Sequence, residues 1–247
     1  MKFGITQRFS CSYLPDEQEQ LLVLADETAP LPDTYGKLIQ VGFRRSGEQI
    51  YRPHCPACDA CQSVRIPVHD FAPSRSQKRV SKRCAGFTTR LSYTPHEHYY
   101  ALYEHYITAR HQDGGMYPPS RTQYEHFILC QWRTPLFIEA WDNDLLIAVA
   151  VTDMIDNGQQ HRALSALYTF FHPDYDSFSL GTWMILNQIK TAQQLQRDYL
   201  YLGYYVGGCQ KMSYKHQFYP YETFIADKWQ RFEKKAASRL YTPPDIG

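Results

Sequence analysis

The stretch Leu136-Phe-Ile-Glu-Ala-Trp-Asp-Asn-Asp-Leu-Leu-Ile-Ala-Val-Ala-Val-Thr-Asp-Met-Ile155 decides the fold class of this chain. Its two apolar runs, Leu136–Trp141 and Leu145–Ile155, are partly β-branched, which is typical of strands. The Asp-Asn-Asp triplet at 142–144 lies between them and favours a tight turn. Together these features predict an antiparallel hairpin.

More strands and a long helix are predicted after the hairpin. Asp-Asn-Gly at 156–158 is another turn signal, and Ala163–Phe171 predicts a third antiparallel strand. A long helix is expected over Ser179–Arg197, followed by strands at Tyr199–Val206 and Glu222–Trp229. Antiparallel strands followed by a crossover helix indicate an α+β fold, with a mixed sheet and helices on its faces.

Two helices are predicted before the hairpin. The segment Thr94-Pro-His-Glu97 has the pattern of a helix start, with an N-cap Thr and Pro at the first helical position, and this helix should run to about Arg110. Ser120-Arg-Thr-Gln123 is a second capping box and opens a helix that includes Trp132. This order of helices and strands resembles the acyltransferase fold that includes the N-acetyltransferases, the GNAT-type fold.

Charge and hydropathy limit where the protein can act. The formal net charge of the 247 residues is +1, so a nucleic acid would have to bind a local basic patch. The chain has no run of roughly 18 apolar residues that would span a membrane. Its first residues, Met1-Lys-Phe-Gly4, contain no apolar signal segment. We therefore expect a cytoplasmic protein without a membrane partner.

A group of cysteines is the sharpest local signal. Cys55, Cys58 and Cys61 are spaced three apart, so their thiolates can converge on one ion or cluster if the loop curls around it. Zinc or an iron–sulfur cluster is one hypothesis, and free thiols in a small packed subdomain are the alternative. The candidates for a fourth ligand are Cys11 first, then Cys84 and His54.

Positive charge is concentrated in one segment that no acidic residue interrupts. Phosphate contacts supply most nucleic-acid affinity, so this segment is a candidate for contact with a tRNA backbone. A solvated face or a mobile linker is the alternative, because charge runs usually belong to such segments. The basic residues are Arg75, Lys78, Arg79, Lys82 and Arg83.

Two segments are candidates for binding a small anionic group. Ser179-Leu-Gly181 opens the long helix, and helix starts hold phosphate or carboxylate groups, although capping by Ser179 would explain the segment equally well. The glycine-rich loop with which acetyltransferases bind coenzyme A is degenerate there, which disfavours coenzyme A. Lys211 and Lys215, four apart, should share one helical face that binds an acidic side chain or the tRNA end, or is simply solvated.

Several motifs, in this order along the chain, resemble the arginyl-tRNA–protein transferase family, especially its bacterial aspartate/glutamate leucyltransferase branch. The resemblance implies an N-terminal Cys-containing part, 1–92, and an acetyltransferase-like catalytic part, 93–247. The eukaryotic relatives carry an adjacent Cys pair where this chain has its Cys triplet. The motifs are Cys11-Ser-Tyr-Leu-Pro15, Gly42-Phe-Arg-Arg-Ser-Gly47, Tyr51-Arg-Pro-His-Cys-Pro-Ala-Cys-Asp-Ala-Cys-Gln-Ser-Val-Arg-Ile-Pro67, Ser179-Leu-Gly181, Tyr201-Leu-Gly-Tyr204 and Met212-Ser-Tyr-Lys215.

The resemblance also implies a reaction. An amino acid, leucine in this branch, passes from aminoacyl-tRNA to proteins that begin with Asp or Glu and marks them for degradation by the N-degron pathway. No cofactor is required for this transfer. The expected partners are Leu-tRNA and the acceptor proteins. The residues expected to bind the acidic N-terminus or the tRNA end lie in the matched motifs and are Arg44, Arg45, Arg65, Ser179, Tyr204, Lys211 and Lys215.

The catalytic residues are not identified by the sequence. Tyr168, Asp174 and Glu139 are generic candidates for a general base. Two other functions remain as alternatives. One is a coenzyme-A-dependent N-acetyltransferase with a metal-binding appendage, and the other is a non-catalytic tRNA-binding adaptor.

Overall fold

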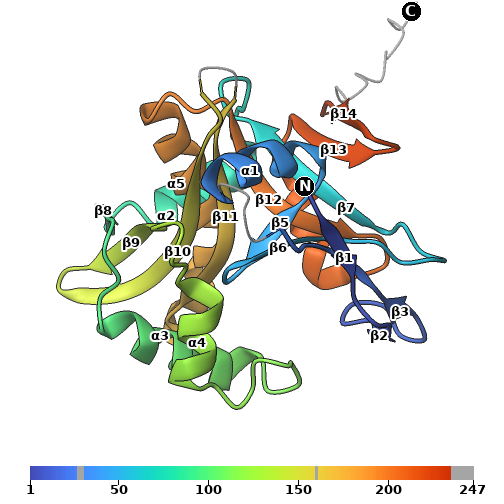
Figure 1. Ribbon diagram of the computed structural model, residues 1–247. Helices are drawn as coiled ribbons and strands as arrows, with labels where there is room; N and C mark the ends of the chain where they lie inside the picture. Colours follow the sequence, from blue (N-terminus) through green and yellow to red (C-terminus); the bar gives the residue numbers. More distant parts are fainter. Residues whose placement is uncertain (27–30, 159–160, 235–247) are drawn as a thin grey trace, which may run out of the picture.

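The computed structural model describes residues 1–26, 31–158 and 161–234 and is built around an eight-stranded mixed sheet (Figure 1). The strand order is β14-β13-β7-β12-β11-β10-β9-β8. Neighbouring strands are antiparallel except β11 and β12, which are parallel. The strands are β7 (Cys61–Pro67), β8 (Thr88–Ser92), β9 (Leu136–Asp142), β10 (Leu145–Asp156), β11 (Arg162–Phe171), β12 (Tyr199–Val206), β13 (Tyr221–Ile225) and β14 (Lys228–Phe232).

Both faces of this sheet are covered, and successive side chains of a strand point to the two faces in turn. On β10, Thr152 accepts a hydrogen bond from Gln188 of α5, whereas the next residue, Asp153, pairs with Arg45 on the other face. No helix of the described residues is long and apolar enough to cross a membrane. The helices are α1 (Leu31–Leu38), α2 (Arg75–Arg83), α3 (His98–Arg110), α4 (Arg121–Ile128) and α5 (Leu180–Gln194), with 3-10 turns η1 (Ile39–Val41), η2 (Pro173–Phe178) and η3 (Gln210–Gln217).

The N-terminal residues form a smaller sheet beside the large one. Its order is β1-β4-β6-β5, and the short ribbon β2–β3 projects beyond it (Figure 1). Tyr35 and Ile39 pack with Ala163 and Tyr201 of the large sheet in one apolar cluster. The strands are β1 (Phe3–Ile5), β2 (Phe9–Ser10), β3 (Gln18–Glu19), β4 (Leu21–Leu24), β5 (Arg44–Ser46) and β6 (Gln49–Pro53).

The structure confirms the α+β class with a mixed sheet, the hairpin β9–β10, the strands β11 and β12 and the long helix α5. The prediction of one strand over Glu222–Trp229 is wrong. Ala226 and Asp227 have φ of 48° and 58° and turn the chain, so the segment forms the hairpin β13–β14. The prediction that the second helix includes Trp132 is also wrong, because α4 ends at Ile128.

Two predictions about helix starts also need correction. Thr94 does not cap α3, because its amide bonds to the Ser92 hydroxyl in a local turn and the helix starts at His98. Ser120 does cap α4, but the Gln123 side chain donates to the Gly115 carbonyl instead of completing the capping box.

The predicted parts 1–92 and 93–247 share one sheet. Strand β7 lies between β12 and β13, so its Arg65 is paired with Tyr201, far away in the sequence. The boundary at 92/93 stays a prediction, and the last residues of the second part, 235–247, lie outside the described residues. The basic segment is the regular helix α2, capped by Ser74, rather than a linker.

Candidate functional site

The site is an opening between the two parallel strands of the large sheet. Strands β11 and β12 pair only from Ala163–Ser165 to Tyr199–Tyr201. Directly beyond that point both strands are irregular, since Leu167 is skipped in the register with β10 and Leu202 in the register with β7. β-Bulges of this kind occur next to active sites, where they redirect side chains.

Strand β11 is accessible at this opening although it is an inner strand. Residues 163–165 and Phe170 are buried, whereas all four residues from Ala166 to Thr169 are only half-buried. Polar backbone groups that have lost their neighbouring strand need other partners. Side chains from two distant segments provide these partners.

Arg44 of β5 and Lys215 of η3 reach the two strands at the opening. The Arg44 guanidinium donates to the Ala166 carbonyl of β11, and the Lys215 ammonium donates to the Tyr204 carbonyl of β12. Gly203 lies between them, since a Cβ there would be in ordinary contact with Arg44 Nη2 at 3.7 Å and with Lys215 Nζ at 3.8 Å, and its φ of 83° favours glycine. The two cations are thus held side by side.

These two cations lack a counter-charge. No Asp or Glu of the described residues forms an ion pair with Arg44 or Lys215, and the buried Nη1 of Arg44 has no hydrogen-bond partner. Burial, and then the charge of Arg44, lower the pKa of Lys215 to about 7. A carboxylate that entered the opening would pair with Arg44 and favour the charged form of Lys215, so the site suits an anion.

The basic helix α2 bonds to segments that follow the two strands of the opening. Gln77 of α2 donates to the Gln217 carbonyl at the end of η3 at 3.1 Å. Arg83, at the other end of α2, donates to the Ser179 hydroxyl at the start of α5 at 3.4 Å. The helix therefore connects the segments that follow β11 and β12. Its exposed cations are Arg75, Lys78, Arg79, Lys82 and Arg83.

Comparisons with known proteins identify the family of the chain. The family model described as the C terminus of arginine-tRNA-protein transferase matches residues 98–225, and the model for the N terminus matches residues 9–79. This chain belongs to the arginine-tRNA-protein transferase family. The two models thus cover both Arg44 of the small sheet and Lys215 at the opening.

Relatives named aspartate/glutamate leucyltransferase match almost end to end. The protein from Pseudoalteromonas atlantica is 54% identical over 95% of this chain and 99% of its own. The Aeromonas hydrophila protein is 49% identical over 95% and 97%, and the Shewanella oneidensis protein is 46% identical over 92% and 93%. The solved structure of L-PGS from Bacillus licheniformis has a TM-score of 0.46 at 10% identity, covering 72% of this chain and 62% of its own, a likeness too distant to support a conclusion.

Two arginines expected at the substrate site of this family member are occupied by internal partners. Arg45 forms two 2.7 Å hydrogen bonds with Asp153, and both side chains are fully buried. Arg65 bonds to Glu222 at 2.6 Å and lies between the rings of Tyr199 and Trp229. Neither guanidinium is directed to the opening as Arg44 is.

The other predicted substrate residues surround the opening to different degrees. Tyr204 contributes its carbonyl to Lys215, while its hydroxyl bonds to Gly42 at 2.8 Å. Ser179 has φ of 58° and makes no side-chain cap, so the capping alternative is wrong. Lys211 is exposed whereas Lys215 is buried, so the two lysines do not share one face. The turn η3 is a 3-10 helix, in which residues three apart, not four apart, are aligned.

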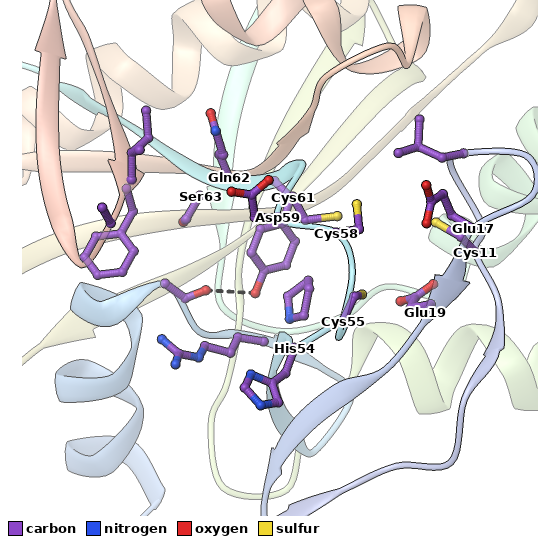
Figure 2. A pocket seen from close by; sticks show the side chains of 18 of the residues that line it. Cys11, Glu17, Glu19, His54, Cys55, Cys58, Asp59, Cys61, Gln62 and Ser63 are labelled. Carbon is purple, nitrogen blue, oxygen red and sulfur yellow. Dashed lines mark hydrogen bonds between the residues drawn. The ribbon is translucent and has the colours of Figure 1, made fainter.

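The four cysteines gather at one pocket of about 330 Å³ (Figure 2). Cys11, Cys55, Cys58 and Cys61 line it with His54, whereas Cys84 is buried elsewhere and bonds to the Phe178 carbonyl. Burial and the neighbouring cysteines raise the pKa of the Cys61 thiol to about 12.

These cysteines line the pocket without forming a preassembled set of metal ligands among the described residues. Within the described ranges no three His, Cys, Asp or Glu side chains are arranged to hold a metal. A metal or cluster at the cysteines stays a prediction from the sequence, and no step of the chemistry below involves it.

The candidate general bases differ in position. Glu139 is buried at the β8–β9 side, where Tyr99 and Trp141 donate to its carboxylate. Asp174 is largely exposed on η2. Tyr168 alone lies at the opening, but burial raises its pKa, which favours the neutral phenol over a base.

Gly203 is not among the residues that the sequence singles out for the site. An isolated glycine inside a strand pattern signals a bulge or the close approach of another group, and Tyr201-Leu-Gly-Tyr204 carries that signal. The partners of Gly203, Arg44 and Lys215, come from other segments, so this signal alone does not name them.

Proposed function

We propose that this chain is an aminoacyltransferase that moves leucine from Leu-tRNA to the N-terminal Asp or Glu of proteins, in the cytoplasm, and so marks them for degradation by the N-degron pathway. The names of its relatives support this activity. The observation that carries it is the unpaired cation pair, Arg44 and Lys215, in the opening between β11 and β12. The sheet order and this opening also support a GNAT-type fold.

The cation pair would hold the acidic side chain of the acceptor. Arg44 has a free Nη1 and a fixed guanidinium, which suits paired hydrogen bonds to a carboxylate. Lys215 would regain its proton as the carboxylate arrives, because the opposite charge raises its pKa. An amide side chain would leave these buried cations uncompensated, so Asn and Gln should be rejected.

Transfer then needs little from side chains. A peptide α-amine has a pKa near 8, so roughly a tenth is neutral and nucleophilic at pH 7. Its nitrogen attacks the ester carbonyl of the donor, the amide C–N bond forms and the ester C–O bond to the terminal ribose breaks. The released tRNA hydroxyl takes up the proton that the amine loses. Holding the two groups together contributes on the order of 7–11 kcal/mol to lowering the barrier.

The function predicts a clear pattern in a transfer assay. We expect purified protein to move labelled leucine from Leu-tRNA to peptides that begin with Asp or Glu, and not to the same peptides beginning with Asn or Gln. An amide side chain leaves each buried cation without a counter-charge, at a cost of about 1–3 kcal/mol. Transfer to the Asp or Glu peptide should therefore exceed transfer to the Asn or Gln peptide by at least roughly tenfold. Equal transfer to Asp and Asn peptides would contradict the proposal. Acetyl-CoA is the control donor and should transfer nothing.

Helix α2 should bind the tRNA backbone. Replacing Lys78, Lys82 and Arg83 by Gln is expected to raise KM for Leu-tRNA and leave KM for the peptide unchanged, because these exposed cations face solvent beside the opening. Binding titrations at several salt concentrations should show a slope that is shallower by about two to three, since fewer counterions are released. Replacing the exposed Lys2, Lys37 and Lys228 by Gln is the control for lost charge. If both triple variants bind tRNA alike, α2 is only a solvated face.

A further inference from the structure

Three tyrosines whose buried hydroxyls have no hydrogen-bond partner pack together by their rings beside the opening. They are Tyr103 of α3, Tyr124 of α4 and Tyr168 of β11. The ring centroids of Tyr103 and Tyr124 are 5.0 Å apart, and those of Tyr103 and Tyr168 are 6.3 Å apart. A buried hydroxyl without a hydrogen-bond partner is unfavourable for folding. Phenylalanine would fill the same space without that cost. Three such hydroxyls in one cluster therefore indicate a polar group that they bind.

The cluster is connected to the reaction site. Tyr168 is half-buried and lies two residues beyond Ala166, whose carbonyl accepts from Arg44. Tyr103 and Tyr124 are 0% and 4% exposed and lie behind it. Tyr168 is therefore the most exposed of the three and the one that links the cluster to the opening.

The tyrosine cluster is uncharged, whereas the surroundings of Arg44 are positively charged. Burial raises the pKa of Tyr103, Tyr124 and Tyr168, so all three stay neutral. No carboxylate of the described residues bonds to any of the three hydroxyls. Their surroundings are apolar, since Phe127 packs on Tyr168 at 5.3 Å and Phe170 packs on Tyr103 at 5.7 Å.

We propose that the hydroxyls of Tyr103, Tyr124 and Tyr168 bind the α-amino group of the aminoacyl donor, and that the rings around them select a donor with an apolar side chain. This inference rests on the proposed function and assigns the second substrate to its own side of the opening. The acceptor carries the carboxylate, which belongs at Arg44. The donor carries an amine and, in leucine, a neutral branched side chain, for which hydroxyls and rings are suitable partners. An arginyl side chain would find no carboxylate there.

The test compares leucyl-tRNA with N-acetyl-leucyl-tRNA, in which the amine is blocked. Wild-type protein should prefer leucyl-tRNA by roughly 10- to 100-fold in kcat/KM, the usual effect of hydrogen bonds to a charged group. In Tyr168→Phe and in Tyr103→Phe this preference should fall by roughly tenfold or more, while KM for the Asp peptide stays unchanged. Leucyl-tRNA should also be a better donor than arginyl-tRNA for the wild type.

Tyr100→Phe is the matched control. Its ring lies 5.6 Å from Tyr124 in the same aromatic group, but its hydroxyl bonds to the exposed Glu104 at 3.1 Å. This variant should keep the wild-type preference. If Tyr168→Phe and Tyr103→Phe keep it too and only melt at a higher temperature, the hydroxyls hold no more than buried water and the inference is overturned while the proposed function stands. Wild-type protein that transfers from neither tRNA would overturn both.

Discussion

Replacing Arg44 by Met is expected to lower kcat/KM for an Asp-starting peptide by roughly 10²- to 10⁴-fold. Two hydrogen bonds from a guanidinium to a carboxylate contribute about 1.5–3 kcal/mol each, and each 1.4 kcal/mol is about tenfold. Folding should change little. Arg44 is buried without an ion-pair partner, so removing its charge removes an unfavourable desolvation cost. This gain offsets the loss of the hydrogen bond to the Ala166 carbonyl. The melting temperature should stay within about 4 °C of the wild type.

The ratio of Asp to Asn peptide separates recognition from general damage. If Arg44 binds the acceptor carboxylate, Arg44→Met should bring this ratio close to one, because transfer to the Asn peptide never used the ion pair. Arg52→Met is the control, since Arg52 also belongs to the small sheet but donates only to the Val41 carbonyl. A full Asp preference in Arg44→Met would show that the acidic side chain is bound elsewhere.

Local patterns predicted the parts of the fold that depend on neighbours in sequence. The Asp-Asn-Asp turn joins β9 to β10, and Asn143 has the positive φ, 52°, that such turns use. The N-terminal strands are short, most of them two to five residues, and lie among turn formers, so no period develops. Strand β7 is buried by β12 and β13, more than 130 residues later in the chain. No local pattern contains that information.

At the site, too, local sequence predicts some features but not which distant side chains meet. The motifs single out their basic residues as a group, but the sequence does not distinguish Arg44 from Arg45. Adjacent strand residues point to opposite sides, so Arg44 reaches the opening while Arg45 reaches Asp153. Asp153 lies 108 residues away, and nothing near Arg45 in sequence indicates the pairing.

Arg45→Met is therefore expected to lower the free energy of unfolding by about 3–5 kcal/mol, because it leaves the Asp153 carboxylate buried and unpaired. For a chain of this size, that corresponds to a loss of roughly 6–20 °C in melting temperature. The control is Asp70→Asn, which breaks the pair with Arg231. Those side chains are 50% and 41% exposed, so this change should cost less than about 1 kcal/mol.

The double variant Arg45→Met, Asp153→Leu decides whether Arg45 also reads the substrate. Replacing both buried charges by apolar side chains removes the unpaired carboxylate, so stability should return close to that of the wild type. The folded double variant should keep its preference for Asp over Asn peptides, because Arg44 and Lys215 are untouched. If it is stable and the preference is lost, Arg45 binds the acceptor, as its place in the motif Gly42-Phe-Arg-Arg-Ser-Gly47 first indicated. If Arg45→Met alone costs no more than Asp70→Asn, the buried pair does not hold the two sheets together.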